Sequence, residues 1–228
     1  METKYLYLLV NIFAFFPPFV LSFDRKVAYF RRWKYLMPAL AIVAVLFIGW
    51  DIIFTYLGVW KFNPDYLTGI EIINLPIEEW LFFLTIPFAS VFIYDCIKAY
   101  FPHLQFREAG IRLARLLAIL LLLTGVISYA RLYTSVTFVL LSGLLFYLGY
   151  KRAGYLGRFF LSYLIILIPF FMTNGILTGS GIENEVVWYN AEENLGIRLI
   201  TIPFEDVFYG MLLILGNVAL YEHFQQKK

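Results

Sequence analysis

Cysteine and histidine are scarce in this 228-residue chain. Cys96 is its single cysteine, so no internal disulfide can form. The two histidines, His103 and His223, lie in a predicted loop and close to the end of the chain. The sequence also lacks a P-loop and a glycine-rich dinucleotide fingerprint. We therefore expect no metal ion and no cofactor, and nothing in the sequence indicates a nucleic-acid partner.

Charged side chains are also few. Asp, Glu, Lys and Arg make up 15% of the chain, whereas soluble domains contain about 25%. Hydrophobic residues make up 61%, against about 45–50% in soluble domains. A soluble fold of this size could not bury so much apolar surface. The composition therefore predicts an integral membrane protein in contact with membrane lipids.

Long apolar runs dominate what remains. A membrane-spanning helix needs about 20 mainly apolar residues. Seven segments are apolar enough, at residues 5–23, 35–57, 72–97, 113–129, 133–150, 159–177 and 197–221. The first is expected to be an uncleaved span rather than a signal peptide, because its basic cluster follows the apolar run. The predicted fold is an all-α bundle of seven transmembrane helices.

The basic residues predict how this bundle is oriented. With seven spans, 14 of the 18 lysines and arginines fall on one side of the membrane. Cytoplasmic loops carry an excess of these residues. We therefore expect the amino terminus outside the cell (inner) membrane and the carboxyl terminus in the cytoplasm.

One motif occurs twice in the chain. A proline follows a glycine by seven residues, and two adjacent acids occupy the second and third positions after the proline. The copies are Gly69, Pro76, Glu78 and Glu79, and then Gly196, Pro203, Glu205 and Asp206. The surrounding order of helices and loops also recurs. We expect a 3+1+3 plan with parallel repeats at 1–100 and 131–228, a linking helix at 101–130, and motif helices that face each other.

Further residues recur at roughly matching places in the two repeats. Trp60 and Trp188 precede the prolines by 16 and 15 residues. Asp51 and Asn174 are polar residues within apolar spans. Because polar groups in a bundle usually face its interior, Asp51 and Asn174 either support the acids or form ordinary helix–helix hydrogen bonds. The two tryptophans are candidates for substrate contact, although tryptophan is also common in interfacial belts.

Four other charged residues carry separate expectations. Glu71 and Arg198 occupy matching motif positions with opposite charge, so we expect them to pair across the repeat axis. Asp95 and Glu222 lie near the cytoplasmic ends of their spans, and we expect both to be solvated.

The adjacent acids allow two interpretations. Proline followed by acids in the first turn is an ordinary helix start, favoured by the helix dipole. Apolar sequence on both sides of the proline instead places the acids inside the membrane, where a charge costs about 2.5–3.5 kcal/mol. Carboxyls that share a pocket can separate into a protonated acid and an ionised base. Such a site could add a proton to one carbon of an apolar substrate and remove a proton from another, while aromatic faces stabilise a carbocation.

The doubled Pro-x-Glu-Glu and Pro-x-Glu-Asp motifs on a small polytopic chain resemble the membrane-integral, flavin-independent lycopene cyclase family in its fused form. The resemblance implies redox-neutral closure of linear lycopene end groups to rings, without a cofactor. It also implies that Glu78, Glu79, Glu205 and Asp206 form the acid–base set, so that Glu78→Gln or Glu205→Gln should abolish ring formation. We expect no fused phytoene synthase domain, and contact with other carotenoid enzymes is a further expectation.

Three other functions are open at this point. A microbial rhodopsin also has seven spans, but it needs a lysine in a span, and residues 197–221 contain none. A protein that binds a polyene without a covalent bond needs no such lysine. A proton-coupled transporter would also use buried carboxylates and internal repeats. Expression in cells that accumulate lycopene separates the enzyme from these alternatives, because only the enzyme changes the pigment.

Overall fold

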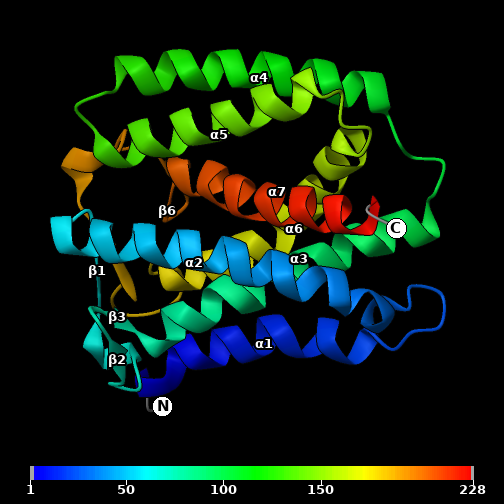
Figure 1. Cartoon of the computed structure of the whole chain (residues 1–228). Coiled ribbons are helices and arrows are strands. Elements are labelled where there is room, and N and C mark those ends of the chain that lie inside the picture. The colour runs from blue at the N-terminus through cyan, green and yellow to red at the C-terminus, as the bar shows by residue number, and fades with distance from the viewer. Residues whose placement is uncertain (1–2, 227–228) are drawn as a thin grey trace.

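The computed structural model describes residues 3–226, in which seven α-helices form one bundle (Figure 1). The helices are α1 (Leu6–Leu21), α2 (Trp33–Leu57), α3 (Ile77–Tyr100), α4 (Arg107–Ile127), α5 (Leu132–Tyr150), α6 (Leu156–Leu177) and α7 (Phe204–Gln226). Short 3-10 turns are η1 (Thr3–Tyr5), η2 (Tyr29–Arg32), η3 (Pro64–Tyr66) and η4 (Ala191–Glu193). Helices α2 to α7 are long and apolar enough to cross a membrane, and α1 is a shorter apolar helix of 16 residues. The predicted all-α membrane bundle is confirmed.

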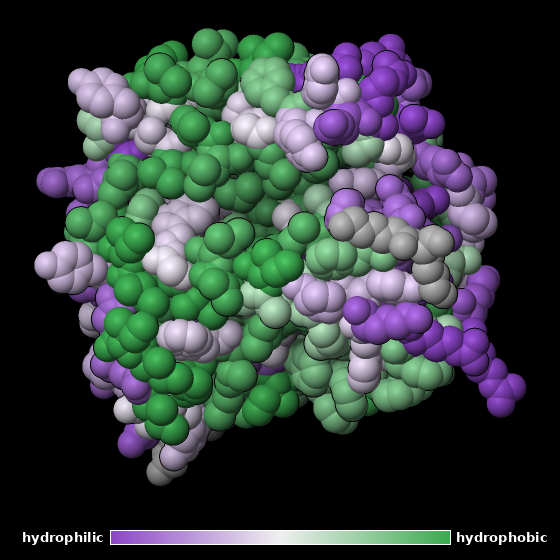
Figure 2. Space-filling model, in the orientation of Figure 1, coloured by the Kyte–Doolittle hydropathy of each residue, from purple (hydrophilic) through white to green (hydrophobic). Residues whose placement is uncertain are grey.

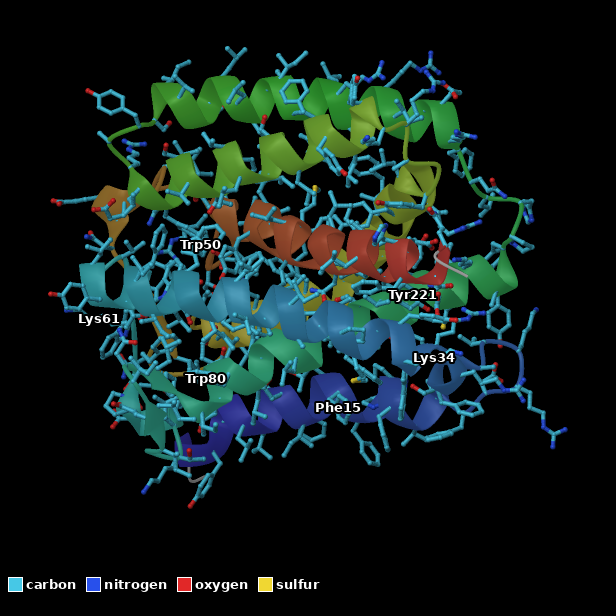
Figure 3. All side chains as sticks on the ribbon, in the orientation of Figure 1. Phe15, Lys34, Trp50, Lys61, Trp80 and Tyr221 are labelled. Carbon is cyan, nitrogen blue, oxygen red and sulfur yellow. The ribbon has the colours of Figure 1, made fainter. Side chains whose placement is uncertain are left out.

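The surface agrees with a membrane location. Many large apolar side chains of the helices are exposed, among them Phe13, Val45, Ile127 and Leu164. Figure 2 shows that hydrophobic residues cover much of one face, while hydrophilic residues gather mainly toward its ends. Lys61 and Lys34 lie toward opposite ends of the bundle in Figure 3. We call the end with the strands the hairpin end and the opposite end the basic end.

Three small antiparallel pairs of strands lie at the hairpin end. Strands β2 (Glu71–Ile72) and β3 (Leu75–Pro76) form one hairpin, and β5 (Arg198–Leu199) and β6 (Ile202–Pro203) form the equivalent hairpin. The prediction that helices begin at residues 72 and 197 is therefore wrong, because these hairpins precede α3 and α7. Each proline ends a strand and leads directly into the helix, where proline is well tolerated since its missing N–H has no helical partner. Helix α4 also begins earlier than predicted, at Arg107 rather than residue 113.

The third pair of strands joins the two repeats. Strand β1 (Trp60–Phe62) pairs with β4 (Val187–Tyr189), with Trp60 opposite Tyr189. Two reciprocal hydrogen bonds flank this pair: Asn63 N donates to Val186 O at 2.8 Å, and Asn190 N donates to Val59 O at 2.9 Å. The two asparagines are 127 residues apart, as are the two motifs. The loops therefore follow the same pseudo-two-fold relation as the motifs.

The helices of the two repeats pack across each other. Helix α3 contacts α1 and α2 of its own repeat, and α7 contacts α5 and α6. In addition, α2 packs on α7 and α6 packs on α3, so each motif helix is covered by a helix from the other repeat. Helices α3 and α7 also contact each other, as expected. Helix α4 lies outside this arrangement and packs on α5 and α6.

The two acids expected to be solvated at the basic end are buried instead. Arg32 lies 2.8 Å from Asp95 Oδ2, and Lys98 lies 2.7 Å from Glu222 Oε1. Tyr221 and Tyr94 donate hydrogen bonds to the same acids, at 2.5 and 2.7 Å. The packed ends of α3 and α7 bury both carboxylates, and basic residues from η2 and α3 then compensate their charge.

The expected ion pair between Glu71 and Arg198 does not form. Both residues are exposed on separate hairpins, and Arg198 Nη1 donates instead to the Thr201 carbonyl oxygen of its own hairpin at 2.8 Å. An exposed pair of this kind would contribute little in any case, about 0–1 kcal/mol.

Candidate active site

A cavity of about 520 Å³ lies beneath the β1–β4 pair. Helices α1, α3, α6 and α7 supply most of its walls, largely with aliphatic and aromatic side chains. Its volume falls within the usual range for small-molecule sites, about 300–1,000 Å³. The cavity residues that can exchange a proton or form a strong hydrogen bond include Tyr7, Asp51, Glu79, Tyr133, Asn174, Tyr189, Asp206 and Tyr209.

The second acid of each motif faces this cavity. Glu79 and Asp206 both line it and are almost fully buried. Tyr7 on α1 donates a hydrogen bond to Glu79 Oε2 at 2.5 Å, and Tyr133 on α5 donates to Asp206 Oδ1 at 2.5 Å. The two arrangements are equivalent, since Tyr7 and Tyr133 belong to the first helices of the two repeats. The structure thus brings one acid from each repeat to one apolar cavity.

The first acid of each motif accepts a hydrogen bond from the loop that precedes its helix. Glu78 and Glu205 are fully buried but do not line the cavity. Glu78 Oε1 accepts a hydrogen bond from the Thr68 backbone N–H at 2.7 Å, and Glu205 Oε1 accepts the same bond from Leu195 at 2.7 Å. Neighbouring residues on an α-helix point about 100° apart, and in both motifs only the second acid is turned toward the cavity. The structure therefore agrees with both interpretations, because the first acid of each pair acts at the helix start and the second lines the cavity.

Asp206 and Glu79 have different surroundings. Asp206 accepts hydrogen bonds from Tyr133, from Asn174 Nδ2 at 2.7 Å and from Tyr189 at 2.9 Å. Glu79 accepts one side-chain hydrogen bond, from Tyr7. Burial raises the pKa of Tyr189 in β4 well above its usual value, and the nearby Asp206 raises it further, so Tyr189 remains a donor.

Asp51 on α2 is the third carboxyl of the cavity. It is only 2% exposed, and its Oδ1 accepts a hydrogen bond from the indole N–H of Trp60. Its Oδ2 has no hydrogen-bond partner in the described part of the chain. Asp51 and Glu79 line the same cavity. Asn174, by contrast, lies on α6, the counterpart of α2, and bonds Asp206 directly.

The two tryptophans are not equivalent. Trp60 lines the cavity, whereas Trp188 is 42% exposed and points away from it. At the repeat spacing of 127 residues, Trp60 corresponds to Val187 and Trp188 to Lys61. A shift of one residue in a strand turns a side chain to the opposite face, which explains the difference. Pro76 and Pro203 are buried at the helix starts and do not line the cavity.

Sequence reasoning missed the four cavity tyrosines: Tyr7, Tyr133, Tyr189 and Tyr209. A usable signal existed for two of them, since Tyr7 and Tyr133 occupy nearly equivalent positions, 126 residues apart. Tyrosine is common in membrane proteins, however, and spacing alone does not separate these from the other members of a set of 17. Within residues 3–226, no group of three or more metal-ligating side chains is placed to hold a metal ion.

These features define a polytopic membrane protein with an apolar cavity that holds acids from both halves. A family model for lycopene cyclase matches residues 4–97 and 130–224, so the chain belongs to the lycopene cyclase family. The two matched segments contain nearly all of the two repeats and leave out the whole of α4, as expected for a fused, two-repeat member. Membership makes the protein an enzyme of carotenoid biosynthesis of the cyclase type, with a carotenoid substrate. Comparison with curated proteins and with solved structures gave no significant match.

Proposed function

We propose that this protein converts the linear ψ-end groups of lycopene to β-rings by acid–base catalysis, as an intramolecular lyase or isomerase. The observation that carries the proposal is the presence of Glu79 and Asp206 in a single apolar cavity. A carboxyl group adds its proton to the terminal double bond and leaves a tertiary carbocation. The neighbouring double bond attacks this cation to form a carbon–carbon bond and a six-membered ring. A carboxylate then removes one ring proton, so the substrate and product are isomers.

Aromatic side chains surround the place where the cation would form. The ring of Trp60 lies 5.3 Å from that of Tyr133 and 6.1 Å from that of Tyr209, between centroids. Tyr189 stacks on Tyr133 at 5.9 Å. Aromatic faces attract cations, and this attraction strengthens when water is absent. The cluster can therefore stabilise the carbocation while the β1–β4 pair above it limits the access of water.

The substrate would enter from the lipid. Phe13 on α1 and Met172 on α6 both line the cavity, yet they are 73% and 67% exposed. The cavity therefore reaches the lipid-facing surface between α1 and α6. A long polyene can place one end group near the acids while the rest of the molecule extends between these helices. This arrangement favours closure of one end group at a time.

The test is pigment analysis in bacterial cells that accumulate lycopene. We expect the wild-type chain to form β-rings, and Glu79→Gln or Asp206→Asn to abolish ring formation while the protein still inserts. Glu78→Gln is the matched control, because it lies beside Glu79 but off the cavity. Although the family resemblance implies that Glu78 belongs to the acid–base set, we expect this variant to retain cyclisation. Full cyclisation by Glu79→Gln would overturn the assignment, and unchanged lycopene with inserted wild type would favour a transporter or a polyene-binding protein.

We further propose that the hairpin end faces outward and the basic end faces the cytoplasm in the cell (inner) membrane. The lysine and arginine bias supports this orientation. It would leave the basic end available to other carotenoid enzymes. A reporter enzyme active only in the cytoplasm, fused at the carboxyl terminus, should be active, and its inactivity would reverse the orientation.

A further inference from the structure

We propose that Asp51 and Glu79 share the proton that starts the reaction, and that Asp206 is the base that ends it. This assignment rests on the proposed function and distributes its two chemical roles between the repeats. It assigns a role in proton donation to Asp51, which lies outside the repeated motif.

Hydrogen-bond donors distinguish the two sides of the cavity. Asp206 receives three donors, from Tyr133, Asn174 and Tyr189. Hydrogen bonds to a carboxylate favour its ionised form, so this environment suits a base. Among residues 3–226, the Tyr7 hydroxyl is the one side-chain donor to Glu79.

A further polar side chain on each side of the cavity supports the same assignment. Asn174 supplies an N–H to Asp206, whereas the equivalent helix of the first repeat supplies Asp51, a second carboxyl that lines the same cavity as Glu79. Like charges in one pocket cannot both ionise easily, and such pairs retain a proton. Asp51 and Asn174 do not occupy matching positions, since the repeat spacing of 127 residues places Thr178 opposite Asp51. The corresponding helices nevertheless supply a carboxyl to one side of the cavity and an amide to the other, and this difference makes the Asp51–Glu79 side the proton donor.

The charged side chains that line the cavity also indicate that a proton is retained there. Asp51, Glu79 and Asp206 all line it, and no lysine, arginine or histidine does so within residues 3–226. Three carboxylates in an apolar cavity without a cation would be very unfavourable, so protons must remain on some of them. Asp51 Oδ2 is buried without a partner, which suits an oxygen that carries or exchanges a proton.

The proton balance is closed over one cycle. The Asp51–Glu79 pair loses one proton to the substrate and becomes fully ionised, and Asp206 gains one proton from the ring. Before the next cycle that proton must return from Asp206 to the pair, or each side must exchange with solvent. Nothing is oxidised or reduced in these steps.

Infrared absorption tests the location of the proton without requiring activity. The purified wild type in lipid nanodiscs is compared at neutral pH with Asp51→Asn/Glu79→Gln and with Asp206→Asn. We expect the double variant to lose a protonated-carboxyl band that the wild type and Asp206→Asn both retain. Loss of that band in Asp206→Asn, or its survival in the double variant, would overturn the proposal. If the wild type shows the band but forms no rings, the proposed function fails while the shared proton stands.

The pH dependence of turnover provides a second test. Asp51→Asn removes a negative neighbour, so Glu79 should ionise at lower pH, and the alkaline limb of the profile should move to lower pH. We expect turnover at neutral pH to fall about 10- to 100-fold, within or below the range for loss of a general acid. Asn174→Asp is the matched variant: a carboxyl beside Asp206 should move the acidic limb to higher pH.

Other titratable groups face this region from every packed element and must be considered in the profile. Those that line the cavity are Tyr7 on α1, Tyr133 on α5, Tyr189 on β4 and Tyr209 on α7. Glu78 on α3 and Glu205 on α7 are buried beside the two cavity acids without lining the cavity. None of them changes between the variants, so shifts in opposite limbs report Asp51 and Asp206. Unshifted limbs in Asp51→Asn and Asn174→Asp would contradict the assignment, whatever the loss of rate.

Discussion

For single residues in this protein, the direction of a side chain on its helix decides its contacts more than its chemical type does. Glu78 and Glu79 are identical side chains one position apart, yet one bonds a loop N–H and the other faces the cavity. Sequence reasoning could find the acids, because charge within apolar sequence is conspicuous. It could not divide their roles, because the first helical residue of α3 fixes the direction of every later side chain.

At the same scale, the buried ion pair at the basic end should stabilise the fold. We expect Arg32→Met to lower the free energy of unfolding by about 3 kcal/mol, because Asp95 remains buried without its cation. Arg31→Met is the control, since Arg31 is exposed and forms no ion pair within the described residues. Thermal unfolding in detergent measures the stability of the Arg32→Met and Arg31→Met variants. The double variant Arg32→Met/Asp95→Asn should recover much of the loss, and failure to recover would show that the charge of Asp95 is not the cause.

At the scale of elements, α4 has no counterpart in either repeat but is tightly fitted. Gly110 in α4 and Gly157 in α6 are so close that a Cβ on Gly110 would lie 2.2 Å from Gly157 N. Glycine is the only residue without a Cβ, so this approach requires it. The repeat pattern predicted that α4 exists, but it contained no information about this contact.

We therefore expect Gly110→Ala to separate the starts of α4 and α6. Overpacking of this kind typically costs about 1–3 kcal/mol. Gly143→Ala in α5 is the control, since its added Cβ would meet nothing within 4 Å. Alanine there should be neutral or stabilising by up to about 1 kcal/mol, through helix propensity. Equal melting temperatures for the two variants would contradict the close contact.

Helix starts illustrate what local sequence can and cannot specify. The apolar pattern extends through both hairpins, so it predicts helices that begin at residues 72 and 197. Ile73 and Ile200 instead adopt left-handed backbone conformations, with φ of 65° and 63°. β-Branched residues rarely adopt this conformation, and composition gives no warning of it. Its occurrence at equivalent positions shows that the hairpin geometry is a property of the repeat.

At the scale of the whole molecule, neither repeat forms the cavity by itself. Glu79 and Asp206 come from different repeats, and each motif helix is covered by a helix of the other half. We expect a chain divided within residues 101–106 to form β-rings when both pieces are co-expressed, and neither piece to do so alone. Pigment analysis measures this outcome. Ring formation by one piece alone would show that its own acid suffices.

The shape of the cavity predicts the order of products. Because the cavity opens to the lipid between α1 and α6 in our proposal, each binding event should close one end group. A time course with limited enzyme should therefore accumulate the monocyclic carotenoid before the bicyclic one, measured by column separation. Appearance of bicyclic product with no monocyclic intermediate would indicate that both ends react before release.

The reciprocal hydrogen bonds between the loops have a consequence for the symmetry of the cavity. Asn63 bonds Val186 and Asn190 bonds Val59 in the same way, so two identical polypeptides could satisfy this contact as a homodimer. A homodimer, however, would place the same carboxyl and the same neighbour on both walls. In a single chain the two halves can differ, and here one half places Asp51 in the cavity and the other places Asn174 there.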